Sequence, residues 1–242
     1  MNAIILAAGV GSRLKELTDV VPKCLLRIGN TILIERQIEM LNQLGIDQIF
    51  VVAGYKKELL EYLVHKYPSV TMIYNSRYKE YNNIYSLYLL KAYIGNTFIL
   101  EGDIYIHDIN VFNCQKKLLN NNYSIYYGIR KKSTQEEWAL KIGKYNVLDD
   151  ILIRKNGVNL NELSMSGISY WSFHDGAIIK KILEYYVEAL NLTEIYWDKI
   201  IKDNLHDFKI KVIEIDSLYE IDTLNDFQQL LKLNNKHKID NK

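Results

Sequence analysis

The chain has 242 residues, with 30 basic and 29 acidic side chains and a formal net charge of +1 at pH 7. This balance argues against a nucleic-acid-binding protein, which relies on a broad basic face. A composition of 48% hydrophobic and 24% charged residues excludes a disordered chain, and the length predicts one large domain or at most two small ones. The absence of a linker favours a single domain over residues 1–242.

The first half of the chain alternates strand-like and helical patterns. The uninterrupted apolar run Ala3–Ala8 predicts a strand buried on both faces. Residues 31–44 carry apolar side chains at helical spacing, and Gly45 ends that pattern. Such repeated strand–helix–strand units predict an α/β fold with a mixed, mainly parallel sheet and helices on both faces. The other elements expected here are strands at 48–53, 70–74, 97–101 and 123–130 and helices at 55–67, 84–94 and 109–120.

The pattern changes after Arg130, where residues 131–137 form a polar loop. No internal repeat or linker separates the second half from the first, so we expect its strands to extend the same sheet. The tail 234–242 reads as frayed. The elements expected in this half are strands at 138–142, 147–153, 164–173 and 208–213 and helices at 176–190 and 223–233.

Two features bear on the compartment. Cys24 and Cys114 lie far apart without metal-ligand spacing, which favours a reducing environment. The apolar run at the N-terminus has the length of a strand and lacks the basic start of a signal peptide, and no stretch is long enough to span a membrane. We therefore expect a cytoplasmic protein that neither inserts into a membrane nor binds nucleic acid.

The most informative segment follows the first predicted strand and reads Leu-Ala-Ala-Gly-Val-Gly-Ser-Arg-Leu over residues 6–14. Glycines and small residues let main-chain N–H groups approach a phosphate or a base edge closely. The dinucleotide fingerprint requires a third glycine where the chain has Leu14, and the P-loop requires lysine after the glycine where the chain has Ser12. Both motifs are excluded. What remains is a glycine loop that brings Arg13 to the strand end, with Lys23 ten residues further on.

Two fixed cations beside a glycine loop suit a triphosphate whose α-phosphorus is attacked, because nucleotidyl transfer depends mostly on positioning and charge neutralisation. The forked donors of Arg13 would hold the β- and γ-phosphates, and Lys23 would act as a point charge at the α-phosphate. We predict that both are catalytic. A strand and turn with two solvated cations is the alternative that these residues leave open.

The glycine loop, with Leu17-Thr18 and Pro22-Lys23 after it, resembles the signature of nucleotidyltransferases that activate sugar phosphates and small phospho-alcohols. Within that superfamily the chain is similar to the bacterial CTP:phosphocholine cytidylyltransferases of the LicC type. The resemblance covers nearly the whole chain and implies a Rossmann-like nucleotidyltransferase fold, with a nucleotide-binding half at 1–130 and an acceptor-binding and lid half at 131–242. Segments 81–89, 166–171, 195–198 and 218–222 match that family in the same order.

The resemblance implies a Mg²⁺ site formed by Asp103, just after the strand at 97–101, and Asp222, after the last strand. Carboxylates and phosphate oxygens are the ligands that Mg²⁺ prefers. Asp222 alone reads equally well as the N-cap of the helix that follows. Glu101 shares its strand face with Asp103, and we expect it beside the ion rather than bound to it.

The resemblance also assigns residues to the nucleotide. Asn83 and Ser86 belong to a segment that the family uses near the base and ribose, although Asn82 or Asn83 reads equally well as a helix cap. The choice of CTP over UTP rests on the resemblance alone. The predicted nucleotide-binding set is Leu6, Ala7, Ala8, Gly9, Gly11, Ser12, Arg13, Asn83, Ser86 and Asp103.

A quaternary ammonium has no N–H donor, so aromatic faces and a nearby carboxylate recognise it. Trp138 follows the polar loop, and Tyr196 has acidic neighbours. We predict that both contact the ammonium and that Asp198 supplies the counter-charge, while Trp171 belongs to the core. A packing contact between elements is the alternative for these aromatic side chains.

Together these expectations describe Mg²⁺-dependent transfer of CMP from CTP to phosphocholine, giving CDP-choline and pyrophosphate. The same transfer to phosphoethanolamine, 2-aminoethylphosphonate or a sugar 1-phosphate is the first alternative. A non-catalytic nucleotide-binding module on the same fold is the second, and it would be expected to lose the lysine or the acidic residues, which this chain retains.

Overall fold

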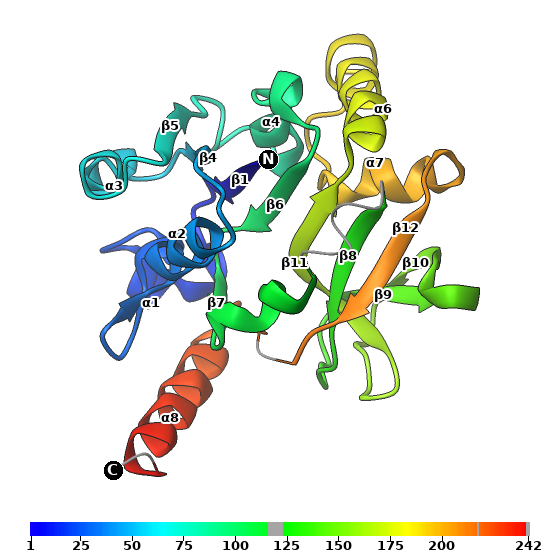
Figure 1. Cartoon of the computed structure of the whole chain (residues 1–242). Helices are drawn as coiled ribbons and strands as arrows, with labels where there is room; N and C mark the ends of the chain where they lie inside the picture. Colours follow the sequence, from blue (N-terminus) through cyan, green and yellow to red (C-terminus); the bar gives the residue numbers. More distant parts are fainter. Residues whose placement is uncertain (116–122, 217, 241–242) are drawn as a thin grey trace.

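In the computed structural model, which describes residues 1–115, 123–216 and 218–240, one nine-stranded sheet forms the centre of the molecule (Figure 1). Seven of its strands form a linear series, which runs β10 (Leu148–Arg154), β9 (Glu137–Ile142), β11 (Leu163–Trp171), β6 (Thr97–Glu101), β1 (Asn2–Ala7), β4 (Ile49–Ala53) and β5 (Val70–Tyr74). The other two are β8 (Ser124–Ile129), which pairs with β11, and β12 (Ile210–Glu214), which pairs with β8.

The sheet is mixed, and most of its strands share one direction. Strands β5, β4, β1 and β6 are parallel to one another, and β11 runs antiparallel to β6. Because β8 and β9 are antiparallel to β11, and β12 is parallel to β8, these three again follow β1. The prediction of a mixed, mainly parallel sheet is confirmed, and the strands of the second half extend the sheet of the first.

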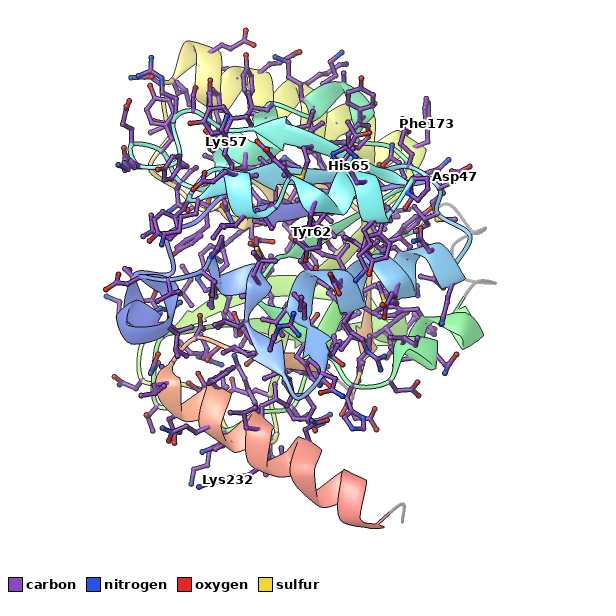
Figure 2. All side chains as sticks on the ribbon, turned by 90° about the vertical axis from the view of Figure 1, so that its left-hand side faces the viewer. Asp47, Lys57, Tyr62, His65, Phe173 and Lys232 are labelled. Carbon is purple, nitrogen blue, oxygen red and sulfur yellow. The ribbon has the colours of Figure 1, made fainter. Side chains whose placement is uncertain are left out.

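Helices cover both faces of the sheet, as the alternation of side chains along β1 requires. Ala3, Ile5 and Ala7 pack on one side with apolar residues of α2 (Leu33–Gln43) and α3 (Tyr62–Lys66). These two helices lie side by side, and the Tyr62 hydroxyl donates to Glu35 of α2 at 2.8 Å (Figure 2). The opposite side of β1 packs against α4 (Asn83–Tyr88), α6 (Phe173–Glu184) and α7 (Asp198–Asp203).

Two small sheets that the sequence patterns do not predict complete the fold. Strand β7 (Ile104–Ile106) pairs antiparallel with β13 (Leu218–Glu220), and β2 (Arg27–Ile28) pairs with β3 (Thr31–Ile32). A third apolar cluster lies here and includes residues of the C-terminal helix α8 (Leu224–Asp240), which projects from the body (Figure 1). The first helix, α1 (Lys15–Thr18), is a single turn.

Helix lengths differ from the sequence-based expectations. The helix expected at 55–67 is a 3₁₀ turn at Lys57–Leu59 followed by α3, and the one at 84–94 is α4 followed by a 3₁₀ turn at Lys91–Tyr93. At 109–120, a 3₁₀ segment covers Ile109–Gln115, and the remainder lies outside the described residues. Apolar periodicity marks the buried face of such segments but does not distinguish one long helix from two short ones.

Local capping explains two other boundaries. The strand expected to reach residue 173 ends at Trp171, because the Ser172 hydroxyl accepts a hydrogen bond from Asp175 and begins α6 there. α6 then gives way to a π-helical turn at Tyr185–Ala189. The tail expected to be frayed continues α8 as far as Asp240, and residues 241–242 lie outside the described part. Within the described residues, no helix has the length and apolar character needed to cross a bilayer.

Candidate active site

The glycine loop and Asp103 meet because β1 and β6 are parallel neighbours whose carboxyl ends share one edge of the sheet. Leu6 pairs with Glu101, and the Gly102 N–H donates to the Leu6 carbonyl oxygen at 3.0 Å. A Cβ atom at Gly102 would lie 3.0 Å from the Cβ of Ala7, so a side chain there would press on the start of the loop. The two segments are therefore in direct contact.

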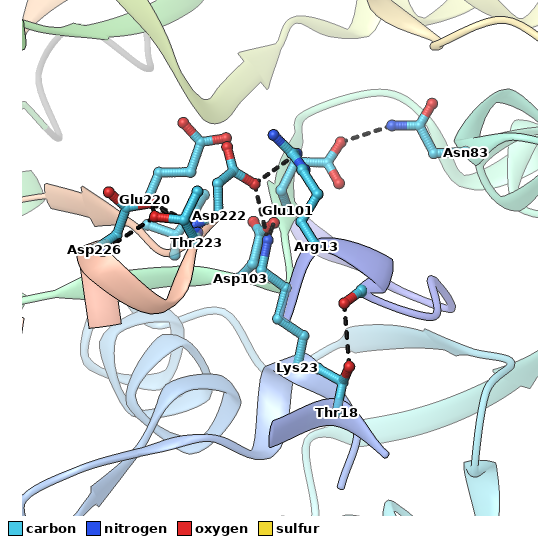
Figure 3. Close-up of polar contacts among 12 residues, drawn as sticks. Arg13, Thr18, Lys23, Asn83, Glu101, Asp103, Glu220, Asp222, Thr223 and Asp226 are labelled. Atoms are coloured by element: carbon cyan, nitrogen blue, oxygen red, sulfur yellow. Dashed lines mark hydrogen bonds and ion pairs between the residues drawn. The ribbon is translucent and has the colours of Figure 1, made fainter. Parts of the chain in front are cut away.

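A buried threonine holds the glycine loop in a tight turn. Gly11 has a φ of +69°, and a Cβ atom on it would lie 3.0 Å from the Thr18 methyl group. The Thr18 hydroxyl lies 3.1 Å from the Gly11 carbonyl oxygen and 3.2 Å from that of Leu14 (Figure 3). Glycine suits this position because a left-handed backbone conformation is costly for other residues.

Lys23 lies between the two predicted metal-binding carboxylates (Figure 3). Its Nζ is 2.6 Å from an oxygen of Asp103 and 3.0 Å from an oxygen of Asp222. Arg13, which is largely exposed, contacts the same Asp222 oxygen at 2.7 Å. The structure therefore brings together four residues that the sequence analysis selected: two cations and two anions at one edge of the sheet.

The pKa values of this cluster follow from its charges. Burial alone would lower the pKa of Lys23, but the carboxylates of Asp103 and Asp222 outweigh it and raise that pKa above its ordinary value. Burial alone would raise the pKa of Asp222, yet Lys23 and then Arg13 hold it below its ordinary value. Lys23 stays protonated and Asp222 stays ionised at neutral pH.

The small sheet of β7 and β13 explains how Asp222 reaches Asp103. Ile104 pairs with Glu220, so the residues that follow β13 run beside the turn that carries Asp103. The N-cap of α8 is Thr223, whose hydroxyl accepts from the Asp226 N–H at 3.2 Å while the Asp226 carboxylate accepts from the Thr223 N–H at 2.7 Å. The cap interpretation of Asp222 is therefore wrong, and its carboxylate faces the two cations instead.

The acidic residues here fit a divalent cation. One carboxylate oxygen from each of Asp103, Glu220 and Asp222 lies within 4.8 Å of the other two. In the described part of the chain, Oδ1 of Asp103 is buried and has no hydrogen-bond partner. A buried carboxylate oxygen without a donor is what a cation would satisfy, and a set of three hard oxygen ligands suits Mg²⁺.

Glu220 is the member of this cluster that the sequence analysis missed. It lies two residues before Asp222, so strand alternation was the available signal. Lys131 lies 2.8 Å from Glu220 and 3.0 Å from Glu137, the first residue of β9. Burial raises the pKa of Glu220 to about 7, although Lys131 acts in the opposite direction.

Glu101 and Asn83 form a polar contact beside this cluster. Asn83 donates its amide N–H to Glu101 at 2.9 Å (Figure 3). It also accepts from the Trp197 main-chain N–H at 2.9 Å. Burial, and then the charge of Asp103, raises the pKa of Glu101 well above its ordinary value. Asn82 is the residue that caps α4, whereas the Asn83 amide is engaged with other parts of the fold.

Ser86 belongs to the same helix but is almost fully buried. Its hydroxyl accepts from the Asn75 amide at 2.9 Å. Both residues border a cleft of about 410 Å³ that also runs along the glycine loop and the end of β6. The cleft is lined by Leu6, Ala7, Ala8, Gly9, Gly11, Ser12, Arg13, Lys23, Cys24, Asn75, Tyr78, Lys79, Glu80, Tyr81, Asn82, Asn83, Ser86, Glu101, Gly102, Asp103, Glu194, Tyr196 and Asp222.

The two predicted acceptor-binding aromatic residues are neighbours in space. The rings of Trp138, on β9, and Tyr196, before α7, meet edge to face with centroids 6.4 Å apart. Tyr196 is half exposed and lines the cleft, whereas Trp138 is partly buried and is not among the lining residues. Trp171 is completely buried in the core, as expected.

Asp198 opens α7 and accepts a hydrogen bond from the Tyr126 hydroxyl at 2.9 Å. Burial raises its pKa to about 7, against the effect of this hydrogen bond. Asp198 does not line the cleft itself, but its charge contributes to the raised pKa of Glu101. Asp198 therefore lies close enough to interact electrostatically with Glu101, which lines the cleft.

Comparisons with known proteins place the chain in a family. Residues 3–108 match the MobA-like NTP transferase domain. The choline-phosphate cytidylyltransferase of Haemophilus influenzae is 36% identical over 236 residues, covering 96% of this chain and 97% of that protein. The choline-phosphate cytidylyltransferase of Streptococcus pneumoniae is 34% identical over 237 residues, covering 95% and 96%. The chain belongs to the choline-phosphate cytidylyltransferase family.

Other similar proteins agree with this family. The solved structure of the CTP:phosphocholine cytidylyltransferase LicC from Streptococcus pneumoniae has a TM-score of 0.87 and 33% identity, and covers 96% of this chain and 98% of that one. A 2-aminoethylphosphonate cytidylyltransferase of Lancefieldella rimae is 30% identical over 227 residues, covering 92% and 89%. The resemblance to the family and its nucleotidyltransferase fold, both stated from the sequence, are confirmed.

Proposed function

We propose that the chain transfers CMP from CTP to phosphocholine, giving CDP-choline and pyrophosphate. Membership of the choline-phosphate cytidylyltransferase family supports this reaction. The observation that carries the proposal is the position of Lys23 between Asp103 and Asp222 at the edge of a cleft lined by the glycine loop. Cations and a metal-binding carboxylate cluster at one place are what displacement at a nucleotide phosphorus needs.

The nucleotide would bind along the glycine loop, in the half formed by residues 1–130. Main-chain N–H groups near Gly9, Gly11 and Ser12 would bind the phosphates, since the small residues there allow close approach. Arg13 is largely exposed and can turn from Asp222 to the β- and γ-phosphates. Leu6, Ala7, Ala8, Asn83, Ser86 and Asp103 complete the proposed nucleotide site.

The reaction needs charge neutralisation more than covalent help from the protein. An oxygen of the acceptor phosphate attacks the α-phosphorus of CTP, the bond from that phosphorus to the bridging oxygen breaks, and pyrophosphate leaves with its electron pair. Lys23 and Arg13 would offset the charge that develops on the phosphate oxygens. Mg²⁺, when held by Asp103 and Asp222 with Glu220 beside them, would supply further neutralisation of the phosphates.

The acceptor would bind in the half formed by residues 131–242. The edge-to-face pair of Trp138 and Tyr196 offers aromatic faces to the trimethylammonium group, which cannot donate a hydrogen bond. Asp198, ionised above about pH 7, would balance the positive charge. The phosphate at the other end of the acceptor would then point toward the metal-binding cluster.

One alternative acceptor has specific support. A relative with 30% identity over most of the chain is a 2-aminoethylphosphonate cytidylyltransferase, so a primary ammonium acceptor is the second candidate. A primary ammonium would use its N–H donors on carboxylates, whereas a quaternary one would depend on Trp138 and Tyr196.

Cytoplasmic location and the absence of a nucleic-acid partner stay predictions.

The test is pyrophosphate release by the purified chain with Mg²⁺, across four nucleoside triphosphates and a panel of phospho-acceptors. The panel holds phosphocholine, phosphoethanolamine, 2-aminoethylphosphonate and a sugar 1-phosphate. We expect CTP with phosphocholine to give the highest kcat/KM. A clear preference for another acceptor would replace phosphocholine in the proposal, and no release with any pair would overturn nucleotidyl transfer itself.

A further inference from the structure

Gln37 is a polar residue on the apolar face of α2. Its neighbours on that face, Ile34, Ile38 and Leu41, pack into the core between the helix and the sheet. Gln37 is as deeply buried as they are, with no exposed surface. The helical pattern alone would favour a leucine or methionine at such a position.

The Gln37 amide group contacts the turn that carries Asp103. Its Nε2 donates to the carbonyl oxygen of Glu101 at 3.0 Å and to that of Ile104 at 3.0 Å. Glu101 is the last residue of β6 and Ile104 is the first residue of β7. The two hydrogen bonds therefore lie on either side of Gly102-Asp103, where the chain passes from the large sheet to the small one.

Within the part of the chain that the structure describes, the NH₂ group of the Gln37 amide is bonded, and its carbonyl oxygen is not. Both partners are carbonyl oxygens, so the NH₂ group must face the turn. Among the described residues, Oε1 of Gln37 is buried without a hydrogen-bond partner. A buried acceptor without a donor destabilises a fold, so the glutamine is explained by its two donors and not by its contribution to the core.

We propose that Gln37 is a positioning residue that fixes the turn at Gly102-Asp103 and thereby directs the Asp103 carboxylate toward the divalent cation. Lys23 holds Oδ2 of Asp103, while Oδ1 is buried without a hydrogen-bond partner among the described residues. The direction of Oδ1 therefore depends on the Lys23 contact and on the backbone of the turn, which Gln37 bonds on both sides. The inference rests on the proposed role of Asp103 as a metal ligand.

Arg36, the preceding residue of α2, provides a matched control. Its Nε donates to the Ile106 carbonyl oxygen at 2.9 Å, and its guanidinium donates to that of His107 at 2.6 Å. Arg36 therefore also ties α2 to the backbone through two hydrogen bonds, but at the far end of β7. Replacing Arg36 therefore weakens the attachment of α2 to the β7 backbone and leaves the hydrogen bonds next to Asp103 in place.

The experiment compares Gln37→Met with Arg36→Met. Methionine matches glutamine in length and keeps the aliphatic part of the arginine side chain, and it removes the hydrogen-bond donors of both. The measurements are the affinity for Mn²⁺ alone, followed by electron paramagnetic resonance, the Tm, and kcat and KM for CTP. We expect Gln37→Met to weaken Mn²⁺ binding at least fivefold and to lower kcat about tenfold, while Arg36→Met stays within twofold of the wild type in both at a similar loss of Tm.

Mn²⁺ affinity in Gln37→Met equal to that in Arg36→Met would overturn the proposal, even if both variants lose activity. Gln37→Leu, which also removes both donors without adding charge, gives the same comparison if Gln37→Met does not fold. Mn²⁺ binding is measured without either substrate. A failure of the proposed cytidylyl transfer in the pyrophosphate assay is therefore distinguishable from a failure of this inference.

Discussion

The main-chain N–H of Ile221 donates to the carbonyl oxygen of Asp103 at 3.3 Å, and this bond extends the pairing of β7 with β13. As a result, Asp222 faces Asp103 across the Lys23 ammonium despite their separation in the sequence. The two carboxylates have oxygens within 4.8 Å of each other, so they repel unless a cation lies between them. Lys23 supplies that charge in the free protein, and a divalent cation would share the role when bound.

Replacing Asp103 by Asn should abolish most of the activity and leave the fold intact. The amide has nearly the same shape but loses the charge, and metal-assisted charge stabilisation is worth several kcal/mol, or at least about 10²-fold in kcat. Pyrophosphate release and thermal unfolding measure the two effects. Asp149→Asn is the control, because Asp149 pairs with Lys141 at 2.8 Å on the surface. Substantial residual turnover in Asp103→Asn would count against a metal-binding role.

Lys23→Met should make the free energy of unfolding depend more strongly on Mg²⁺ than it does in the wild type. Breaking a buried ion pair by removing one partner costs about 3–5 kcal/mol, since Asp103 would lose its cation and Asp222 would keep only the exposed Arg13. Thermal unfolding with and without Mg²⁺ should therefore show a larger Mg²⁺-induced rise in Tm for the variant than for the wild type. Lys141→Met, which removes an exposed cation, should leave the free energy of unfolding nearly unchanged and show no such difference. Equal Mg²⁺ responses would contradict this account.

Much of the site could be predicted from local sequence. A glycine loop after one strand and Asp103 after another must meet if the strands are adjacent and parallel, and β1 and β6 are. The contact with Asp222 could not be derived in this way. It depends on β7 and β13, which are three residues each and lie more than a hundred residues apart, so neither carries a clear pattern. Its assignment to the metal rested on the family resemblance.

Two other residues show where sequence reasoning stops. Gln37 is one polar side chain on an apolar helix face, and nothing in its neighbourhood indicates which carbonyl groups it bonds. Trp138 and Trp171 both lie on strands, yet only Trp138 meets Tyr196 while Trp171 is buried in the core. Alternation assigns a side chain to one face of a strand, but the position of the helices decides which face is open.

The two loop glycines should respond differently to alanine. Gly11→Ala should cost about 1–2 kcal/mol, because its φ of +69° is unfavourable for other residues and its Cβ would press on Thr18. Gly9 has open space around its Cβ position, so Gly9→Ala should keep the wild-type Tm and raise the KM for CTP if the phosphates approach there.

Gly45→Ala is the control for the glycine prediction, since Gly45 has a φ of +80° with open space around it and lies outside the cleft. It should lose stability and keep the wild-type KM for CTP. A Gly9→Ala variant with unchanged KM would place the phosphates away from that part of the loop. Denaturant unfolding and initial rates at varied CTP measure both quantities.

Trp138→Leu should weaken acceptor binding selectively. A cation over an aromatic face is worth about 0.5–2 kcal/mol, so the KM for phosphocholine should rise about 2- to 30-fold while the KM for CTP stays unchanged. Trp138→Phe should retain part of the effect, because it keeps a smaller aromatic face. Tyr145→Leu, a change at an exposed tyrosine remote from the cleft, is the control. Equal changes in both KM values would indicate a structural role for Trp138.

The raised pKa of Asp198 predicts opposite effects of pH on binding and on stability. Below about pH 7 the carboxyl group is neutral and balances an ammonium poorly, so the KM for phosphocholine should rise as pH falls through about 7. The folded-state pKa exceeds the unfolded value of about 4, so the folded state holds a proton that the unfolded state has lost. The contribution of Asp198 to stability therefore falls as pH rises from about 4 to about 7.

Glu220 also has a pKa raised to about 7, so it contributes to the pH dependence over the same range. Because Asp198→Asn leaves Glu220 unchanged, the difference between the variant and the wild type reports Asp198 alone. Relative to the wild type, Asp198→Asn should gain stability with rising pH over that interval and reach a plateau above it. Its KM for phosphocholine should lose the pH dependence. Tyr126→Phe removes the hydrogen bond that favours the ionised form, so it should move the wild-type midpoint to higher pH. A pH profile of KM that is identical in the wild type and Asp198→Asn would assign the counter-charge to another carboxylate of the cleft.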